Sequence, residues 1–543
     1  MDKSVSNSIV EAFGNMTRQV WSISIDYSIS PVAVAVEGDG CLLQDRGGRY
    51  TVSWNNCGRW ESFLVIDQKE AYLTAMGGQV CPIYSRRIGS IIRLSNVASR
   101  LMRPNETFRI DAFVLLQNLS GISFPRNNVF KDIRLLEAST EYRLSSLGIE
   151  RLRSALEEST TVLSSDEVLD MAIAQWEAQL SSGADIAVLL SGGYDSRLNL
   201  AIACHAARRY GNRVYAFHEY KDAHEESIAT AVASVAKVPL SIHDRRAFVE
   251  TNRAVIMDSS FIRFQSGFYR ENLIRWHGYL AHIRTKLPGC VIMGMGAEAH
   301  KGKYYRQLES ISEDGAKIFG INEVVVETIA RKLGLNHQDH DSQRLFFDRL
   351  AIYASAFREF TMQVDYVHYQ TYVSNGYGHR CHDLQQHFAI PFPFLDNAFL
   401  AAVFALPAKE KENFAMVTRG IARLHPALGE IPYISANSKA LGPKVQRPFS
   451  KALSGIRNRF GPIYYDFFPP RRKGRDQLAM IEREALSSIQ THSSLTALLI
   501  DQALMGIQDV PFVDLDYLVQ ACLYFAQLEQ DMDVICTTKV VKA

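Results

Sequence analysis

An apolar segment that runs directly into two glycines and a helix start is the feature that most constrains the fold of this chain. The segment Ile186–Leu190 is followed by Ser191-Gly192-Gly193-Tyr194-Asp195-Ser196. Glycines let the backbone turn tightly and approach a ligand closely, and N–H groups at a helix N-terminus favour an anion such as pyrophosphate. A carboxylate at Asp195 beside phosphate indicates a bridging Mg²⁺. The alternative is a plain glycine turn, and the GxxxxGK[ST] phosphate loop is absent.

Around this segment, short apolar runs typical of strands alternate with stretches whose apolar residues recur at helical spacing. Ser164 and Glu167 fit a capping box, and the apolar residues that follow recur at helical spacing. This alternation predicts a parallel α/β sheet covered on both faces, and beyond residue 296 most patterns are helical. The expected elements are a helix after Ser164, a strand at 186–190, a helix at 197–210, a strand at 213–218 and a helix at 225–237.

The first part of the chain has a different pattern. Short runs rich in Val, Ile, Tyr and Trp alternate with turns rich in Gly and Asn, which predicts a mostly β region. A polar stretch at 157–161 resembles a linker, so we expect one domain at 1–160 and a second at 165–543. The expected strands lie at 20–25, 62–67, 79–85 and 90–95.

Composition excludes several classes of protein. The chain has 543 residues, 47% of them apolar, with 59 Lys and Arg against 58 Asp and Glu, so it is neither a disordered chain nor a generally basic one. Its eight cysteines include no CxxC pair, no apolar stretch is long enough for a membrane span, and no secretory signal is evident. We therefore expect a cytoplasmic protein without a membrane partner.

The local charge is less even than the total. Residues 444–475 contain nine Lys and Arg and one acid, Asp466, interleaved with aromatic residues. This stretch is either a solvated loop near the mouth of an active site or a surface that holds a peptide or a polyanion.

The hexapeptide Ser191–Ser196 resembles the SGGxDS loop of the ATP-pyrophosphatase (PP-loop) superfamily. Three further segments resemble, in the same order, motifs of asparagine synthetases and β-lactam synthetases: 293–299 resembles GxGADE, 393–396 resembles PFLD, and 432–442 resembles the Arg-x-Lys-x-Gly region. The resemblance covers residues 165 to 450 and implies roles for individual residues. Leu190, Ser191, Gly192, Gly193, Asp195, Ser196, Gly294 and Gly296 would bind ATP and its pyrophosphate, Asp195 and Glu298 would hold Mg²⁺, and Lys439 would be catalytic, with Lys444 as its rival and Glu225 as a further nucleotide-site candidate.

The N-terminal region resembles the same family more loosely. Residues 128–136 are similar to the end of the family's glutaminase-like domain, an N-terminal-nucleophile (Ntn) hydrolase fold with a sandwich of β-sheets, although the glycine of that pattern is missing. Asp2 stands where glutamine-dependent members carry their nucleophilic cysteine, and no cysteine precedes Cys41. We therefore expect this domain to be structural and the amine to come from a source other than glutamine.

Two other groups of residues need an interpretation. Ala389 occupies the position of the glutamate that, with a tyrosine, deprotonates the amine in β-lactam synthetases, so that mechanism is not expected intact. His379, His382 and Asp383 would share a helix face, as a metal site, as part of an acceptor pocket or as ordinary packing. The tyrosines nearby are core residues or a replacement phenol; they are Tyr366, Tyr369, Tyr372 and Tyr377.

The resemblance implies an ATP-dependent, AMP-forming amide synthetase, in which a carboxylate is adenylated and an amine then displaces AMP. The favoured reaction is lactam or macrolactam formation on a small molecule or peptide, as in lasso-peptide cyclases, with other proteins of the pathway as possible partners. The alternatives are amidation of a small acid or uronic-acid sugar with free ammonia, and a non-catalytic nucleotide-binding partner. A tRNA-modifying PP-loop enzyme is disfavoured by the other motifs, so nucleic acid is not an expected partner.

Overall fold

The fold is known from a computed structural model of the 543-residue chain. Within it the described residues are 21–28, 32–37, 41–46, 49–56, 59–67, 69–75, 82–109, 128–156, 163–181, 184–220, 222–244, 247, 282–284, 286–287, 290–294, 362, 365–366, 369–370, 373, 378–385, 388, 392–433 and 535–537. None of the helices in these ranges has the length and apolar character that crossing a membrane requires.

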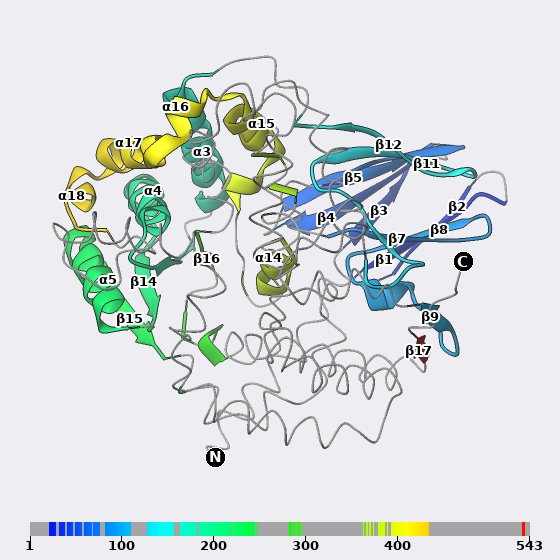
Figure 1. The fold of residues 1–543 in the computed structure, drawn as a ribbon, viewed down its shortest axis with the longest axis horizontal. Helices are drawn as coiled ribbons and strands as arrows, with labels where there is room; N and C mark the ends of the chain where they lie inside the picture. The colour runs from blue at the N-terminus through cyan, green and yellow to red at the C-terminus, as the bar shows by residue number, and fades with distance from the viewer. Residues whose placement is uncertain are drawn as a thin grey trace, which may run out of the picture.

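Two antiparallel sheets make up the N-terminal region and lie as neighbouring layers in Figure 1. One has the order β10-β7-β8-β1-β2 and the other the order β12-β11-β6-β5-β4-β3. The bounds of their strands are β1 Ser22–Asp26, β2 Ala33–Glu37, β3 Cys41–Asp45, β4 Tyr50–Asn56, β5 Arg59–Ile66, β6 Glu70–Thr74, β7 Tyr84–Ile88, β8 Ile91–Ser95, β10 Arg134–Leu135, β11 Thr140–Ser145 and β12 Gly148–Ser154. The 3-10 helix η3, Ala98–Leu101, follows β8.

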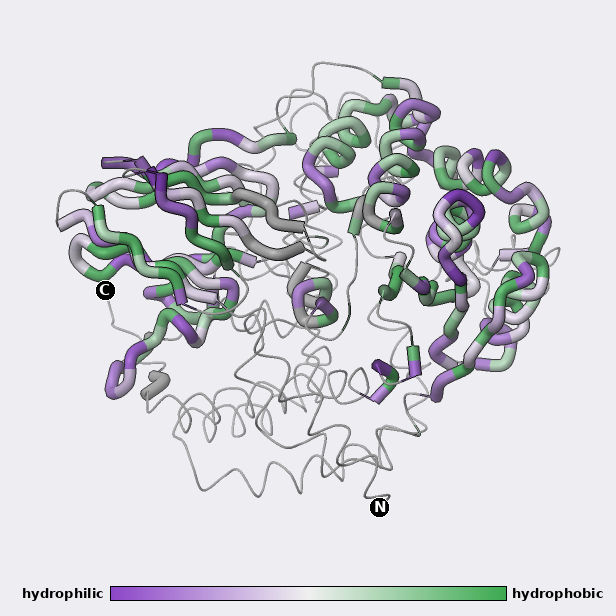
Figure 2. The backbone as a smooth tube through the Cα atoms, turned by 180° about the vertical axis from the view of Figure 1, so that it is seen from behind, coloured by the Kyte–Doolittle hydropathy of each residue, from purple (hydrophilic) through white to green (hydrophobic). Residues whose placement is uncertain are grey.

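The core of this region lies between the two sheets. Alternate residues of β11 are buried, as the two-residue period of a strand with one covered face requires. Ile23 and Ile25 of β1 share one apolar cluster with Leu64 of β5 and Leu73 of β6. Two sheets that each bury one face against the other explain why the strands alternate in hydropathy (Figure 2).

A parallel sheet follows, with the order β15-β14-β13-β16. Its strands are β13 Ile186–Leu190, β14 Val214–Glu219, β15 Leu240–His243 and β16 Cys290–Ile292. The helices are α3 Ser165–Leu180, α4 Tyr194–Tyr210, α5 Ala223–Ala236, α14 Gly378–Gln385, η7 Pro393–Leu395, α15 Asn397–Ala405, α16 Ala408–Lys411, η8 Glu412–Phe414, α17 Ala415–Leu424 and α18 Pro426–Gly429. The antiparallel sheets and this parallel sheet with its helices confirm the predicted α/β class.

Both faces of the parallel sheet are covered. Val188 of β13 and Ile292 of β16 pack in a cluster with the buried residues of α3, α4 and α17. Ala187 and Val291, the next residues toward the N-terminus of each strand, join the apolar cluster of the antiparallel sheets instead. Burial on both faces is why β13 is a continuous apolar run instead of an alternating one.

The described residues between 362 and 373 contact both regions. The hydroxyls of Tyr369 and Ser139 lie 2.8 Å apart, and the Gln370 side chain donates to the Ala138 carbonyl at 3.2 Å. On the other side, the Tyr369 ring packs edge-on against Phe404 of α15, with 5.8 Å between ring centroids. These contacts connect the end of the antiparallel region to the helices that cover the parallel sheet.

A short parallel pair joins distant parts of the chain. Strand β17, Ile535–Thr537, pairs with β9, Thr107–Arg109, so a segment near the C-terminus lies beside the N-terminal region (Figure 1). The expected linker at 157–161 lies outside the described residues.

Candidate functional site

The loop between β13 and α4 presents backbone N–H groups at a helix start. Strand β13 ends at Leu190, and α4 begins at Tyr194 with Gly193 as its N-cap. Because glycine has no side chain, no side-chain cap occupies the first amides of the helix. The helix starts three residues earlier than the expected Arg197. An uncapped helix start of this kind, at the carboxyl end of a parallel strand, is suited to an anionic ligand.

Two serine hydroxyls hold the loop together. The Ser196 Oγ accepts the Ser191 amide at 3.1 Å and lies 3.1 Å from the Ser191 Oγ. The Ser191 Oγ in turn accepts the Gly193 amide at 3.2 Å. These bonds fix the curvature of the loop before any ligand is bound, so little ordering is needed on binding.

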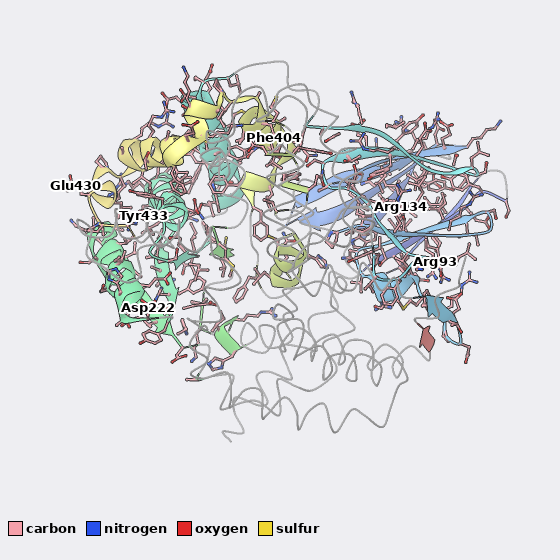
Figure 3. The ribbon with its side chains drawn as sticks, viewed as in Figure 1. Arg93, Arg134, Asp222, Phe404, Glu430 and Tyr433 are labelled. Carbon is pink, nitrogen blue, oxygen red and sulfur yellow. The ribbon has the colours of Figure 1, made fainter. Side chains whose placement is uncertain are left out.

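A carboxylate from the neighbouring βα unit contacts the loop. The Gly192 amide donates to the Glu225 Oε1 at 3.4 Å, and Glu225 is nine-tenths buried. Its backbone amide donates to Asp222, the N-cap of α5, at 2.9 Å, which fixes the start of that helix. Figure 3 labels Asp222 beside the α5 and β14 elements. Glu225 therefore accepts an amide that such a loop would otherwise present to a phosphate.

Two motifs separated by about 100 residues meet at this edge of the sheet. A Cβ added to Gly294 would lie 3.4 Å from the Asp195 Cβ and 3.8 Å from the Ser196 amide nitrogen. The meeting follows from the pairing of β16 with β13, which brings the carboxyl ends of the two parallel strands together. Gly294 therefore lies beside the helix start, where an added Cβ would make an ordinary van der Waals contact with Asp195.

Most of the side-chain atoms in the site that could bind a metal ion are oxygens. The Oδ1 atom of Asp195 is shielded from solvent, and the hydroxyls of Ser191 and Ser196 and the Glu225 carboxylate lie in the same loop region. Mg²⁺ prefers ligands of this hard, oxygen type, so Asp195 and its oxygen-bearing neighbours could hold a magnesium ion, which would supply positive charge beside an anionic ligand. No cluster of three or more His, Cys, Asp or Glu suited to a metal occurs within the described ranges.

Several predicted residues come together here, and others cannot be placed. Leu190, Ser191, Gly192, Gly193, Asp195 and Ser196 form one loop and helix start, with Gly294 beside them. The remaining predicted residues lie outside the described residues: Gly296, Glu298, Ala389, Lys439 and Lys444.

The other motif residues have structural roles. Asp396 caps α15 by accepting the amides of Ala398 and Phe399 at 2.9 and 3.0 Å, and Phe394 packs edge-on against Trp176 of α3. Among the tyrosines, Tyr366 and Tyr369 are core residues, whereas 372 and 377 lie outside the described part of the chain. His382 is buried on α14.

Three buried polar residues around the loop were missed by the sequence reasoning. The His218 Nδ1 lies 3.0 Å from the Leu190 carbonyl, at the last residue of β13. Asn199 of α4 is 1% exposed and lies 3.9 Å from where a Cβ of residue 294 would be, and Arg197 is fully buried one residue after Ser196. For Arg197 and Asn199 the available signal was that both are polar residues in the first turns of a helix that follows a buried strand.

No model of a protein family matches this chain, and no curated protein matches its sequence.

Proposed function

We propose that this chain is an ATP-dependent amide synthetase that releases AMP and pyrophosphate, with a PP-loop type of synthetase region. The observation that carries the proposal is the position of Gly294 beside Asp195 and Ser196, so close that an added Cβ would touch Asp195, at the carboxyl ends of β13 and β16. Two motifs chosen from the sequence for one ligand lie side by side, although nothing in their spacing requires it.

In this proposal the loop from Ser191 to Ser196 binds the pyrophosphate part of ATP. The uncapped amides of α4 and its helix dipole stabilise negative charge on the phosphate oxygens. Asp195, with Glu298 from the sequence motif, would hold Mg²⁺, which supplies neutralisation of the phosphate charge. Lys439 would stabilise the charge that builds on the α-phosphate during both half-reactions.

The reaction itself is largely alignment of two reactants. A substrate carboxylate oxygen attacks the α-phosphorus and releases pyrophosphate, leaving an acyl-adenylate. An amine nitrogen then forms the amide bond, and AMP leaves with the electron pair of the broken acyl–oxygen bond while the amine loses its proton. Holding the reactants in place and neutralising the developing charge would together contribute much of the rate enhancement in such a site.

We further propose that the amine belongs to the substrate itself, so that the product is a lactam or macrolactam. The N-terminal antiparallel region would be a glutaminase-like sandwich that serves as a structural partner. Its apolar cluster is continuous with one face of the parallel sheet, as a structural role requires. Free ammonia as the amine is the other outcome that the assay for pyrophosphate release distinguishes.

A second candidate is nucleotide binding without turnover. It is favoured by one observation: the Glu225 carboxylate occupies the Gly192 amide, which a phosphate-binding loop would leave open. A chain of this kind would bind ATP and present a peptide to another enzyme.

The experiment measures pyrophosphate and AMP released from ATP with candidate peptides, with ammonia and with glutamine. We expect release with an internal amine substrate and none with glutamine alone. Asp195→Asn should abolish release. Asp185→Asn is the matched control, because Asp185 lies just before the other end of β13, where it pairs with Arg213 at 2.6 Å, and it should retain activity. ATP binding without any pyrophosphate release would favour the second candidate, and absence of ATP binding would contradict both.

A further inference from the structure

Arg197 is a buried cation that contacts two segments of chain more than 200 residues apart. Its side chain is fully buried in the first turn of α4. The Nη1 group donates to the Ile431 carbonyl at 2.6 Å and reaches the Leu428 carbonyl at 3.4 Å. The Nη2 group donates to the Pro432 carbonyl at 2.6 Å and to the Gly192 carbonyl at 3.3 Å.

These contacts neutralise no charge. Within the described part of the chain no carboxylate pairs with Arg197, and the guanidinium is bonded to backbone carbonyls. Burial lowers the pKa of the Arg197 guanidinium from its ordinary value, but an arginine side chain stays protonated in proteins. Burying a charge is costly, and among the described residues only backbone carbonyls compensate the Arg197 guanidinium, so a role beyond packing is expected for it.

Aromatic rings strengthen the same connection. Tyr194 stacks on Tyr433 with 4.3 Å between ring centroids and 17° between ring planes, and the Arg197 guanidinium lies 5.5 Å from the Tyr194 ring centroid. The centroid of the Phe414 ring lies 6.0 Å from the centroid of each of the two tyrosine rings. In Figure 3 Tyr433 is labelled close to α4, the helix that carries Tyr194 and Arg197. The segment Leu428–Tyr433 is therefore held against the first turn of α4 by bonds and by ring stacking.

The segment Leu428–Tyr433, which Arg197 holds, is followed closely in the sequence by Lys439. Lys439, the proposed catalytic residue, comes six residues after Tyr433, so the chain can carry it at most about 20 Å from that residue. The Gly192 carbonyl, at the other end of the guanidinium, belongs to the loop proposed to bind pyrophosphate. One side chain thus touches the phosphate loop and the chain that leads to the lysine.

We propose that Arg197 is a positioning residue that fixes the segment Leu428–Tyr433 to the pyrophosphate loop and thereby limits how far the proposed catalytic Lys439 can lie from the bound ATP. This inference rests on the proposed function. Arg197 touches neither ATP nor the substrate, and it acts through the backbone of the two segments. The fork of the guanidinium suits the task, because its N–H groups point at several carbonyls at once, which a lysine ammonium cannot reproduce in the same geometry.

A purely structural role makes a different prediction. An arginine that only satisfies the carbonyls at the end of α18 would lower stability when replaced and leave the turnover of the folded enzyme unchanged. A positioning role predicts lower turnover in a folded enzyme that still binds ATP.

The test compares Arg197→Gln and Arg197→Lys with Arg209→Gln in the full chain. Arg209 lies on the same helix, is 64% exposed and pairs with Glu177, so its replacement should change neither readout. Tyr433→Leu is the fourth variant, because it weakens the ring stack while leaving Arg197 in place. Hydrogen exchange of residues 426–433 reports on the connection, and pyrophosphate release gives kcat and the KM for ATP.

We expect Arg197→Gln to exchange faster at 426–433 and to lose about 100-fold in kcat, with little change in the KM for ATP, as a misplaced catalytic group would cause. Arg197→Lys and Tyr433→Leu should fall between Arg197→Gln and the wild-type protein. Unchanged exchange at 426–433, or an unchanged kcat in Arg197→Gln, overturns the inference. If the wild-type protein releases no pyrophosphate, the proposed function fails, and the exchange of residues 426–433 still decides whether Arg197 holds the segment.

Discussion

Gly420 of α17 packs so closely on Leu198 of α4 that a Cβ at position 420 would lie 2.8 Å from the Leu198 Cδ1. The same Cβ would lie 3.0 Å from the Leu169 Cδ1 of α3. Leu198 is fully buried and Leu169 is 1% exposed, so any shift of either side chain has to be accommodated within their packed apolar cluster. The missing side chain is what allows α17 to cover the start of α4, from which Asp195 and Arg197 project.

Gly420→Val is therefore expected to lower the free energy of unfolding by about 2 kcal/mol, since added methyl groups in a packed core force shifts that cost about 1–3 kcal/mol. Thermal or urea unfolding measures the loss. Gly429→Val is the control, because Gly429 is exposed and a Cβ there would meet only Ile421 at 3.9 Å. Equal losses in both variants would contradict the packing argument.

The contact between the antiparallel region and the helices gives a second prediction. Ser139 and Tyr369 share a buried hydrogen bond of 2.8 Å, and Ser139 is fully buried. Tyr369→Phe and Ser139→Ala should each reduce stability by about 1 kcal/mol, and the double variant should lose less than the sum, because the second change removes a group already left without its partner. Strict additivity in urea unfolding would show that the two hydroxyls do not stabilise each other.

Local sequence signals predicted the elements around the site well. The capping box of Ser164 and Glu167 is present, with both reciprocal hydrogen bonds, and α3 begins at Ser165 as expected. The apolar run of β13 has the predicted bounds. Both depend on neighbouring residues alone, which is why the sequence pattern is enough to predict them.

Features that depend on distant partners were not predictable in this way. The partners of Arg197 at 428, 431 and 432 are 231 to 235 residues away, so its burial has no local signal. The strand expected at 79–85 is β7, which begins at Tyr84, because its extent is set by pairing with β8 and β10 and not by its own composition. Gly294 was chosen from its motif, yet its position beside Asp195 required the pairing of β16 with β13.

Two partly buried thiols give a chemical prediction. Burial raises the pKa of Cys204 on α4 and of Cys290 on β16 to about 11 in each case, from 9.0. Only the thiolate is nucleophilic. Because each pKa is about two above its ordinary value, the folded chain at pH 8 contains about 100-fold less thiolate at these positions than the unfolded chain. Timed labelling with iodoacetamide and mass spectrometry of the two peptides measures this, and the urea-unfolded protein at the same pH is the control.

The raised pKa values of the two thiols also predict how the free energy of unfolding changes with pH. A folded-state pKa above the unfolded value means that the folded chain retains these protons more tightly, so this contribution is fully present below pH 9 and is lost as the pH rises from 9 towards 11. Labelling rates at pH 8 that are equal in the folded and unfolded chains would contradict the burial of both thiols.

Replacing Glu225 tests whether its negative charge lowers the affinity of the loop for ATP. Its carboxylate accepts the Gly192 amide, so it places a negative charge where phosphate is proposed to bind. Glu225→Gln keeps an oxygen acceptor for that amide and removes the charge, so ATP without Mg²⁺ should bind about tenfold more tightly, which corresponds to about 1.4 kcal/mol of removed repulsion. Calorimetric titration with a non-hydrolysable ATP analogue measures the affinity.

Glu226→Gln is the matched control, because it removes the same charge from the next position of α5, and no hydrogen bond joins the Glu226 side chain to the described part of the loop. If Glu225→Gln weakens binding only when Mg²⁺ is present, the carboxylate acts through the metal ion instead, and the repulsion argument is wrong.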